Sequence, residues 1–162
     1  MRADLDHLRR VHRRELALAV RILFESFEDW LKTKQKRERK QGRILKVILY
    51  GSHARGTAVE DRGSGYMSDY DLLVVVNHED LTDFEVWESA EDALSIEQHV
   101  RGRIRREVSL IVHSLQDVND QLARGRYFFM DIVREGIALY EAEGFPLVDP
   151  QPLTPEVALE EA

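Results

Sequence analysis

Two aspartates separated by one residue, Asp69 and Asp71, are the side chains of this chain best suited to chemistry. They flank Tyr70 at the start of an apolar, β-branched run to Val76, which predicts a buried strand. Successive side chains of a strand point to opposite faces, so both carboxylates are expected on one face, where they can share divalent cations. Asp71 lies inside the apolar run, where an unpaired carboxylate is costly and a metal would relieve that cost. An all-oxygen site favours Mg²⁺ or Mn²⁺.

A Gly-Ser pair follows the preceding apolar run, Ile44–Tyr50, which also predicts a buried strand. A turn from a strand into a helix offers free backbone N–H groups, and Gly51 lets a phosphate approach them closely. Ser52 adds a hydroxyl donor, and Arg55 follows on the same side of the first helical turn, within reach of the phosphates. Metal-binding acids beside a phosphate-binding turn are the components of metal-assisted phosphoryl or nucleotidyl transfer.

Each motif also has an explanation without chemistry. Asp is common in turns, Gly and Ser are frequent where a strand meets a helix, and Arg55 could form a surface ion pair. His53, inside the first motif, is expected to face solvent. The chain has six histidines without metal-ligand spacing and no cysteine, so zinc sites and thiol nucleophiles are not expected. A Walker P-loop is excluded, because no G-x-x-x-x-G-K-[ST] segment is present.

The elements that must position these motifs alternate between helix and strand, which predicts an α/β (α+β) domain with a mixed sheet. Helices are expected over residues 3–40, 81–106 and 127–134, and from a capped start at Ser114 to a break at Gly125. Besides the two runs above, strands are expected over residues 107–113 and 137–140. The Gly-containing loop between the two motifs is expected to be mobile and to lie over the site.

The segments GSHARG (51–56) and SDYDLLVVV (68–76) resemble the signature of the DNA polymerase β-like nucleotidyltransferase superfamily, and within it the minimal nucleotidyltransferases. The resemblance implies a mixed sheet flanked by helices. It also implies that Gly51, Ser52 and Arg55 bind a nucleoside triphosphate and that Asp69 and Asp71 bind Mg²⁺ or Mn²⁺. The expected reaction transfers a nucleoside monophosphate to an acceptor hydroxyl and releases pyrophosphate.

The chain departs from this family at the third carboxylate, which commonly lies on a neighbouring strand. Aligning residues 108–112 with that strand places Ser109 at the position of the acid, and a hydroxyl is a poor metal ligand and general base. Glu107 lies two residues earlier, so strand alternation predicts that it shares a face with Ser109 and serves as the third catalytic acid. Alternatively, Glu107 ends a charged helix and pairs with an arginine.

The length of 162 residues, 33% charged residues and a net charge of −7 predict a soluble globular protein. The negative charge argues against broad binding to nucleic acid. Because the N-terminus has no apolar signal segment, we expect a cytoplasmic location. The sequence does not distinguish three classes of acceptor: a small-molecule antibiotic, a protein tyrosine and an RNA end. A non-catalytic nucleotide-binding or antitoxin module is the alternative to an enzyme.

Three regions are expected along the chain: an N-terminal helical segment (1–43), the nucleotidyltransferase core (44–141) and an acidic tail (142–162). The tail holds all four prolines and a helix start at Thr154 that stops after about two turns, too short to be stable alone. The resemblance implies fusion or pairing with a helical HEPN domain, often in toxin–antitoxin systems. We therefore expect the tail to lead to such a domain, or to pack against a second copy in a homodimer.

Overall fold

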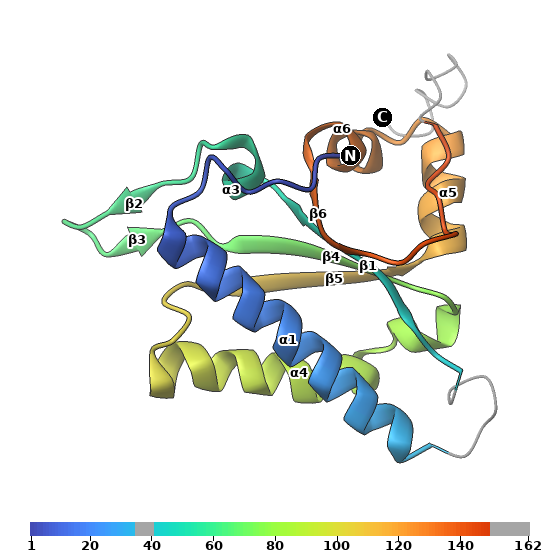
Figure 1. Ribbon diagram of the computed structural model, residues 1–162, viewed down its shortest axis with the longest axis horizontal. Helices are drawn as coiled ribbons and strands as arrows, with labels where there is room; N and C mark the ends of the chain where they lie inside the picture. Colours follow the sequence, from blue (N-terminus) through green and yellow to red (C-terminus); the bar gives the residue numbers. More distant parts are fainter. Residues whose placement is uncertain (35–40, 150–162) are drawn as a thin grey trace.

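The computed structural model describes residues 1–34 and 41–149. At its centre is a four-stranded sheet in the order β5-β4-β1-β6 (Figure 1), formed by β1 (Ile44–Tyr50), β4 (Tyr70–Val76), β5 (Val108–Ser114) and β6 (Ile137–Glu141). Strand β1 is antiparallel to both β4 and β6, whereas β4 and β5 are parallel. The sheet is therefore mixed, and the predicted α/β architecture with flanking helices is confirmed.

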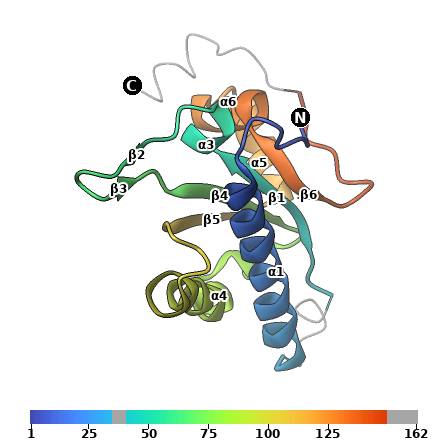
Figure 2. The ribbon, with the colours of Figure 1, turned by 60° about the vertical axis from the view of Figure 1, so that its left-hand side comes forward.

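The two central strands are buried on both faces, which explains why their sequences are apolar at nearly every position. Val47, Leu49 and Leu72 belong to the core on one face, which α1 (Arg10–Lys32) and α4 (Phe84–Ile96) cover. Ile48 and Leu73 belong to the core on the other face, under α5 (Leu115–Ala123) and α6 (Tyr127–Glu135). Figure 2 shows the two pairs of helices on opposite sides of the sheet.

Helix α1 starts later than the sequence predicts, because Arg2 forms a bridge to Ile137 of β6 and a turn follows before the helix, with the Leu8 N–H donating to the Leu5 carbonyl. The buried side of α1 includes His12 and Glu15 as well as Leu16. These two polar residues lie on the buried side of the helix between Val11 and Leu16, where its apolar residues are five positions apart. Residues 35–40 of the predicted helix lie outside the described part of the chain.

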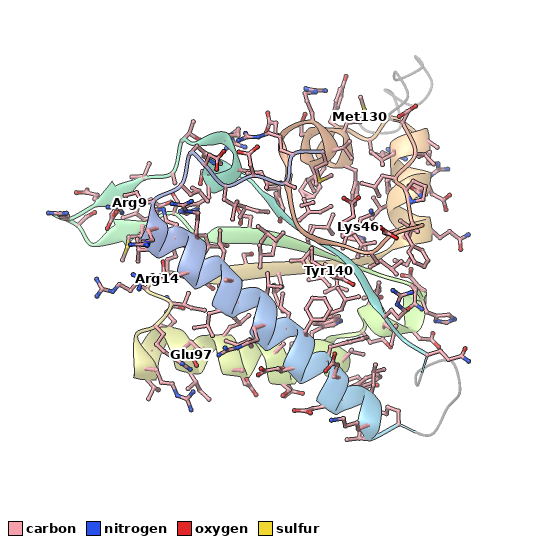
Figure 3. All side chains as sticks on the ribbon, viewed as in Figure 1. Arg9, Arg14, Lys46, Glu97, Met130 and Tyr140 are labelled. Atoms are coloured by element: carbon pink, nitrogen blue, oxygen red, sulfur yellow. The ribbon has the colours of Figure 1, made fainter. Side chains whose placement is uncertain are left out.

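The helix predicted over residues 81–106 ends early. A short 3₁₀ turn (Glu79–Thr82) precedes α4, and a π-helical turn, η2 (Glu97–Arg101), follows it and stops at Gly102, which has φ 67°. The side chain of Glu97, the first residue of η2 (labelled in Figure 3), accepts hydrogen bonds from Arg101 and Arg103. The chain then turns back toward the sheet, so Arg106 becomes buried.

The loop between the motifs forms a small hairpin, β2 (Glu60–Asp61) and β3 (Tyr66–Met67). It projects away from the sheet (Figures 1 and 2) and is tied to the start of α1 by an ion pair of 2.7 Å between Arg9 and Glu60. The expectation that this loop lies over the site was therefore wrong.

The C-terminal elements lie where the sequence predicts them, to within about a residue. Ser114 caps α5 by accepting a hydrogen bond from the Asp117 N–H at 3.1 Å, as its spacing predicts. The helix start expected at Thr154 lies outside the described residues. None of the described helices is long and apolar enough to cross a membrane.

Candidate active site

The pairing of the strands brings the two motifs together. Because β1 runs antiparallel to β4, the C-terminal end of β1 meets the N-terminal end of β4, and Tyr50 lies opposite Asp71. Because β4 and β5 are parallel, Ser109 lies opposite Asp71 on the other side. Three segments that are distant in the sequence therefore meet at one edge of the sheet.

Gly51 and Asp71 are in direct contact at this edge. Gly51 has φ 76°, a conformation that favours glycine, and a Cβ at this position would overlap the Asp71 Oδ2. Any other residue would displace the carboxylate and strain the backbone. Residue 51 is therefore glycine for two reasons, and the turn at Gly51 and the Asp71 carboxylate form one surface.

Helix α3 (Ser52–Arg55) starts immediately after this glycine. Ser52 is its first residue and is half-buried, and the Arg55 N–H donates to the Gly51 carbonyl at 3.1 Å. At four residues the helix has little dipole of its own. The groups available to an anion here are therefore the first backbone N–H groups, the Ser52 hydroxyl and the Arg55 guanidinium.

The two aspartates form a site of concentrated negative charge. Asp71 is half-buried and Asp69 is exposed. Burial raises the pKa of Asp71, the charge of Asp69 raises it further, and the Arg55 guanidinium acts in the opposite direction. A cation between the two carboxylates would relieve this repulsion.

Asp69 and Asp71 are the residues that could hold a metal, and their oxygens suit a hard cation. In residues 1–34 and 41–149 no group of three or more His, Cys, Asp or Glu side chains comes together to form a metal cluster. A metal here would therefore take its remaining ligands from a substrate and from water.

A cavity of about 240 Å³ opens beside the glycine turn, between β1, α3 and α6. Tyr50 and Phe128 form an aromatic pair on its wall, with their ring centroids 5.7 Å apart. Arg55 reaches Glu135 of α6 at 3.5 Å. Arg55 thus lines this cavity together with Gly51, and its charge acts on Asp71, so it can contact an anion held at the glycine turn.

The backbone of Glu107 lies beside that of Tyr70, whose N–H donates to the Glu107 carbonyl at 2.9 Å, but its side chain lies on the α4 side. Glu107 precedes β5, so strict strand alternation does not apply to it, and it lines a small pocket with residues of α4. Burial raises the pKa of Glu91 on α4, and the charge of Glu107 raises it further, whereas the charges that act on Asp71 are those of Asp69 and Arg55. The residue beside Asp71 on the neighbouring strand is Ser109, about 4.8 Å away across the sheet.

His53 is fully buried, so the expectation that it faces solvent was wrong. Its Nδ1 lies 2.9 Å from the Asp69 carbonyl oxygen, and its Nε2 lies 3.3 Å from the Arg106 Nη1. A carbonyl only accepts and a guanidinium only donates, so both contacts require the neutral ring with its hydrogen on Nδ1. Burial lowers the pKa of His53 to about 4, with the Arg106 charge acting in the same direction.

His53 belongs to a cluster of buried polar side chains, which also contains His12, Glu15, Tyr70 and Arg106. The Tyr70 hydroxyl donates to Glu15 at 2.6 Å, and the Arg106 guanidinium forms an ion pair of 3.7 Å with the same carboxylate. Arg106 also lies over the Tyr70 ring, 5.4 Å from its centroid. Sequence reasoning missed this cluster, and its one visible signal was the position of His12 and Glu15 on the apolar stripe of α1.

Comparison with known families adds one finding. A family model described as "Polymerase beta, Nucleotidyltransferase" matches residues 32–144, a range that contains both motifs and all four strands of the sheet. No curated protein and no solved structure matches the chain significantly.

Proposed function

The chain belongs to the polymerase beta nucleotidyltransferase family, and we propose that it is a Mg²⁺-dependent enzyme that transfers a nucleoside monophosphate from a triphosphate to an acceptor hydroxyl. The contact between Gly51 and Asp71 carries this proposal. It joins the turn suited to phosphate and the carboxylates suited to metal into one surface, as attack on a metal-bound phosphate requires.

The site residues would have two roles, triphosphate binding and metal binding. Gly51, Ser52 and Arg55 bind and orient the triphosphate, through backbone N–H groups, a hydroxyl and a guanidinium. Asp69 and Asp71 hold Mg²⁺ or Mn²⁺, which when bound neutralises charge on the phosphates and on the leaving pyrophosphate. The acceptor oxygen bonds to the α-phosphorus, the bond from that phosphorus to the β-phosphate oxygen breaks, and pyrophosphate leaves.

The acceptor hydroxyl must also lose its proton, and the proposed site is poorly suited to accept it. Ser109 occupies the neighbouring-strand position beside Asp71, and a serine hydroxyl is a poor base. Glu107 as third acid stays a prediction, but its position beside α4 does not support it. With two carboxylates alone, the proton would pass to water or to a group on the acceptor.

The second candidate is a non-catalytic nucleotide-binding or antitoxin module, which Ser109 favours for the same reason. Pairing with a helical HEPN domain, formation of a homodimer and a cytoplasmic location stay predictions that rest on the resemblance and the composition. The acceptor class stays open for the enzyme.

The experiment that tests the proposal incubates the protein with each of the four α-³²P-labelled nucleoside triphosphates, Mg²⁺ and acceptors from the three classes. We expect Mg²⁺-dependent binding of a triphosphate and label on one acceptor, both lost in Asp71→Asn. Asp83→Asn is the matched control, because Asp83 is an exposed carboxylate at the start of α4 whose side chain makes no capping bond. Binding without transfer to any acceptor would favour the non-catalytic module, and absence of both would reject the proposal.

A further inference from the structure

We propose that His53 is a positioning residue that holds the start of α3 and the backbone of Asp69 in one fixed arrangement, so that the phosphate-binding turn and the metal-binding carboxylates act as a unit. This inference rests on the proposed function for the identity of the two ligands. It concerns a residue whose side chain faces away from them.

The bond from His53 to Asp69 bridges two segments that the chain itself connects loosely. His53 lies in α3 and Asp69 immediately precedes β4, and the sequence between them is the projecting β2–β3 hairpin. The hydrogen bond of 2.9 Å from Nδ1 to the Asp69 carbonyl closes this gap directly. It fixes the backbone of a proposed metal ligand against the helix that starts at Ser52.

The His53 ring is itself held in one orientation. Arg106 donates to Nε2, and Arg106 in turn pairs with Glu15 of α1 and lies over the Tyr70 ring. The His53 backbone carbonyl also accepts a hydrogen bond of 2.7 Å from His7. The connection therefore runs from α1 through Arg106 and His53 to Asp69.

An apolar side chain could fill this buried position without the cost of burying a polar ring. What histidine adds is direction, since each ring nitrogen has one partner of fixed chemical type. Gly51 and Asp71 form the second contact between the same two segments. With both contacts in place, neither the turn nor the aspartates can shift independently.

The consequence is a thermodynamic coupling between metal and triphosphate. If the metal-binding and triphosphate-binding residues keep a fixed relative position, Mg²⁺ tightens triphosphate binding by a constant factor. A change in that relative position reduces the factor. The factor can be measured without knowing the acceptor, by titrating α,β-methylene forms of the four nucleoside triphosphates with and without Mg²⁺. The methylene group prevents transfer during the titration.

His53→Asn and His53→Gln form the decisive pair. The amide nitrogen of Asn takes about the place of Nδ1 and can still donate to the Asp69 carbonyl, whereas that of Gln takes about the place of Nε2. We expect the Asn variant to keep most of the factor and the Gln variant to lose at least about fivefold of it. Tyr70→Phe is the control, because it removes a hydrogen bond from the same cluster but keeps the His53 contacts.

The result that overturns the inference is equal coupling in the wild type and in both His53 variants, or a loss in Tyr70→Phe as large as that in His53→Gln. A wild-type protein that binds no triphosphate, or binds it independently of Mg²⁺, would instead reject the proposed function and the inference with it. If the Gln variant does not fold, ¹⁵N NMR of the wild-type ring decides. The inference requires the tautomer with hydrogen on Nδ1, and the Nε2–H tautomer would overturn it.

Discussion

The edge of the sheet that carries the aspartates has two contrasting sides. On the α1 side, Glu15, His53 and Arg106 are buried and bonded to one another. On the α6 side, Arg55 and Glu135 form a partly exposed ion pair beside an open cavity. Both sides combine arginine and glutamate, but the pair on the α1 side (the closed side) is buried, whereas the pair on the α6 side (the open side) is partly exposed. The closed side can fix geometry, and the open side has room for a ligand.

The largest expected effect comes from the aspartates between the two sides. Asp69→Asn and Asp71→Asn should each abolish nucleotidyl transfer, since a metal-binding carboxylate contributes several kcal/mol to transition-state stabilisation. Burial raises the pKa of Asp71, so its charge destabilises the fold, and Asp71→Asn should raise the Tm in the absence of metal. Transfer assays at saturating Mg²⁺ and thermal unfolding in EDTA measure the two effects. Full activity in either variant would reject the metal assignment.

A matched pair of truncations tests the comparison itself. Glu15→Ala leaves Arg106 buried without its ion-pair partner and should lower the free energy of unfolding by about 3–5 kcal/mol. Glu135→Ala removes the partner of a partly exposed arginine and should cost at most about 1 kcal/mol. Urea unfolding of both variants gives the two values. Similar costs would mean that the two sides do not differ in the way their contacts indicate.

Ser109→Asp sharpens the comparison by adding the carboxylate that the edge lacks. Ser109 lies beside Asp71, so the new acid can serve as metal ligand or base, and transfer should rise by about 10²-fold or more. Triphosphate affinity should change little. Glu107→Gln is the companion variant, and its position beside α4 predicts unchanged turnover. A tenfold loss in Glu107→Gln would restore Glu107 as the third acid.

Much of this arrangement could be predicted from the sequence, because local patterns determine it. The runs at Ile44–Tyr50 and Tyr70–Val76 are apolar on both faces, and both are strands with these bounds. The alternation argument failed at Glu107 because β5 begins one residue later. Only the complete fold brings His53 and Arg106 together, so no spacing in the sequence could indicate their contact.

The closed side should also make stability depend on pH. Burial holds the pKa of His53 at about 4, against 6.5 for an ordinary histidine. Between these values the unfolded chain binds a proton that the folded protein does not, so stability is present above pH 6.5 and falls as the pH drops toward 4. His53→Asn should reduce this slope by up to about 1.4 kcal/mol per pH unit. Unfolding free energies at pH 4.5, 5.5 and 7 measure it, and an unchanged slope would contradict the buried neutral ring.

The smallest effect is expected at Ser52, the first residue of α3. Ser52→Ala removes one hydroxyl donor but leaves the backbone N–H groups and Arg55 in place, so triphosphate binding should weaken by about 1–2 kcal/mol. The stability of the protein should stay unchanged, because the helix that starts at Ser52 has only four residues. Calorimetric titration with a triphosphate, together with thermal unfolding, separates the two readouts. Unchanged affinity with a lower Tm would mean that Ser52 stabilises the turn and does not contact phosphate. Weaker binding with an unchanged Tm would show that the turn at Gly51 forms without the Ser52 hydroxyl. The glycine conformation and the buried contacts of the closed side would then be what holds the turn.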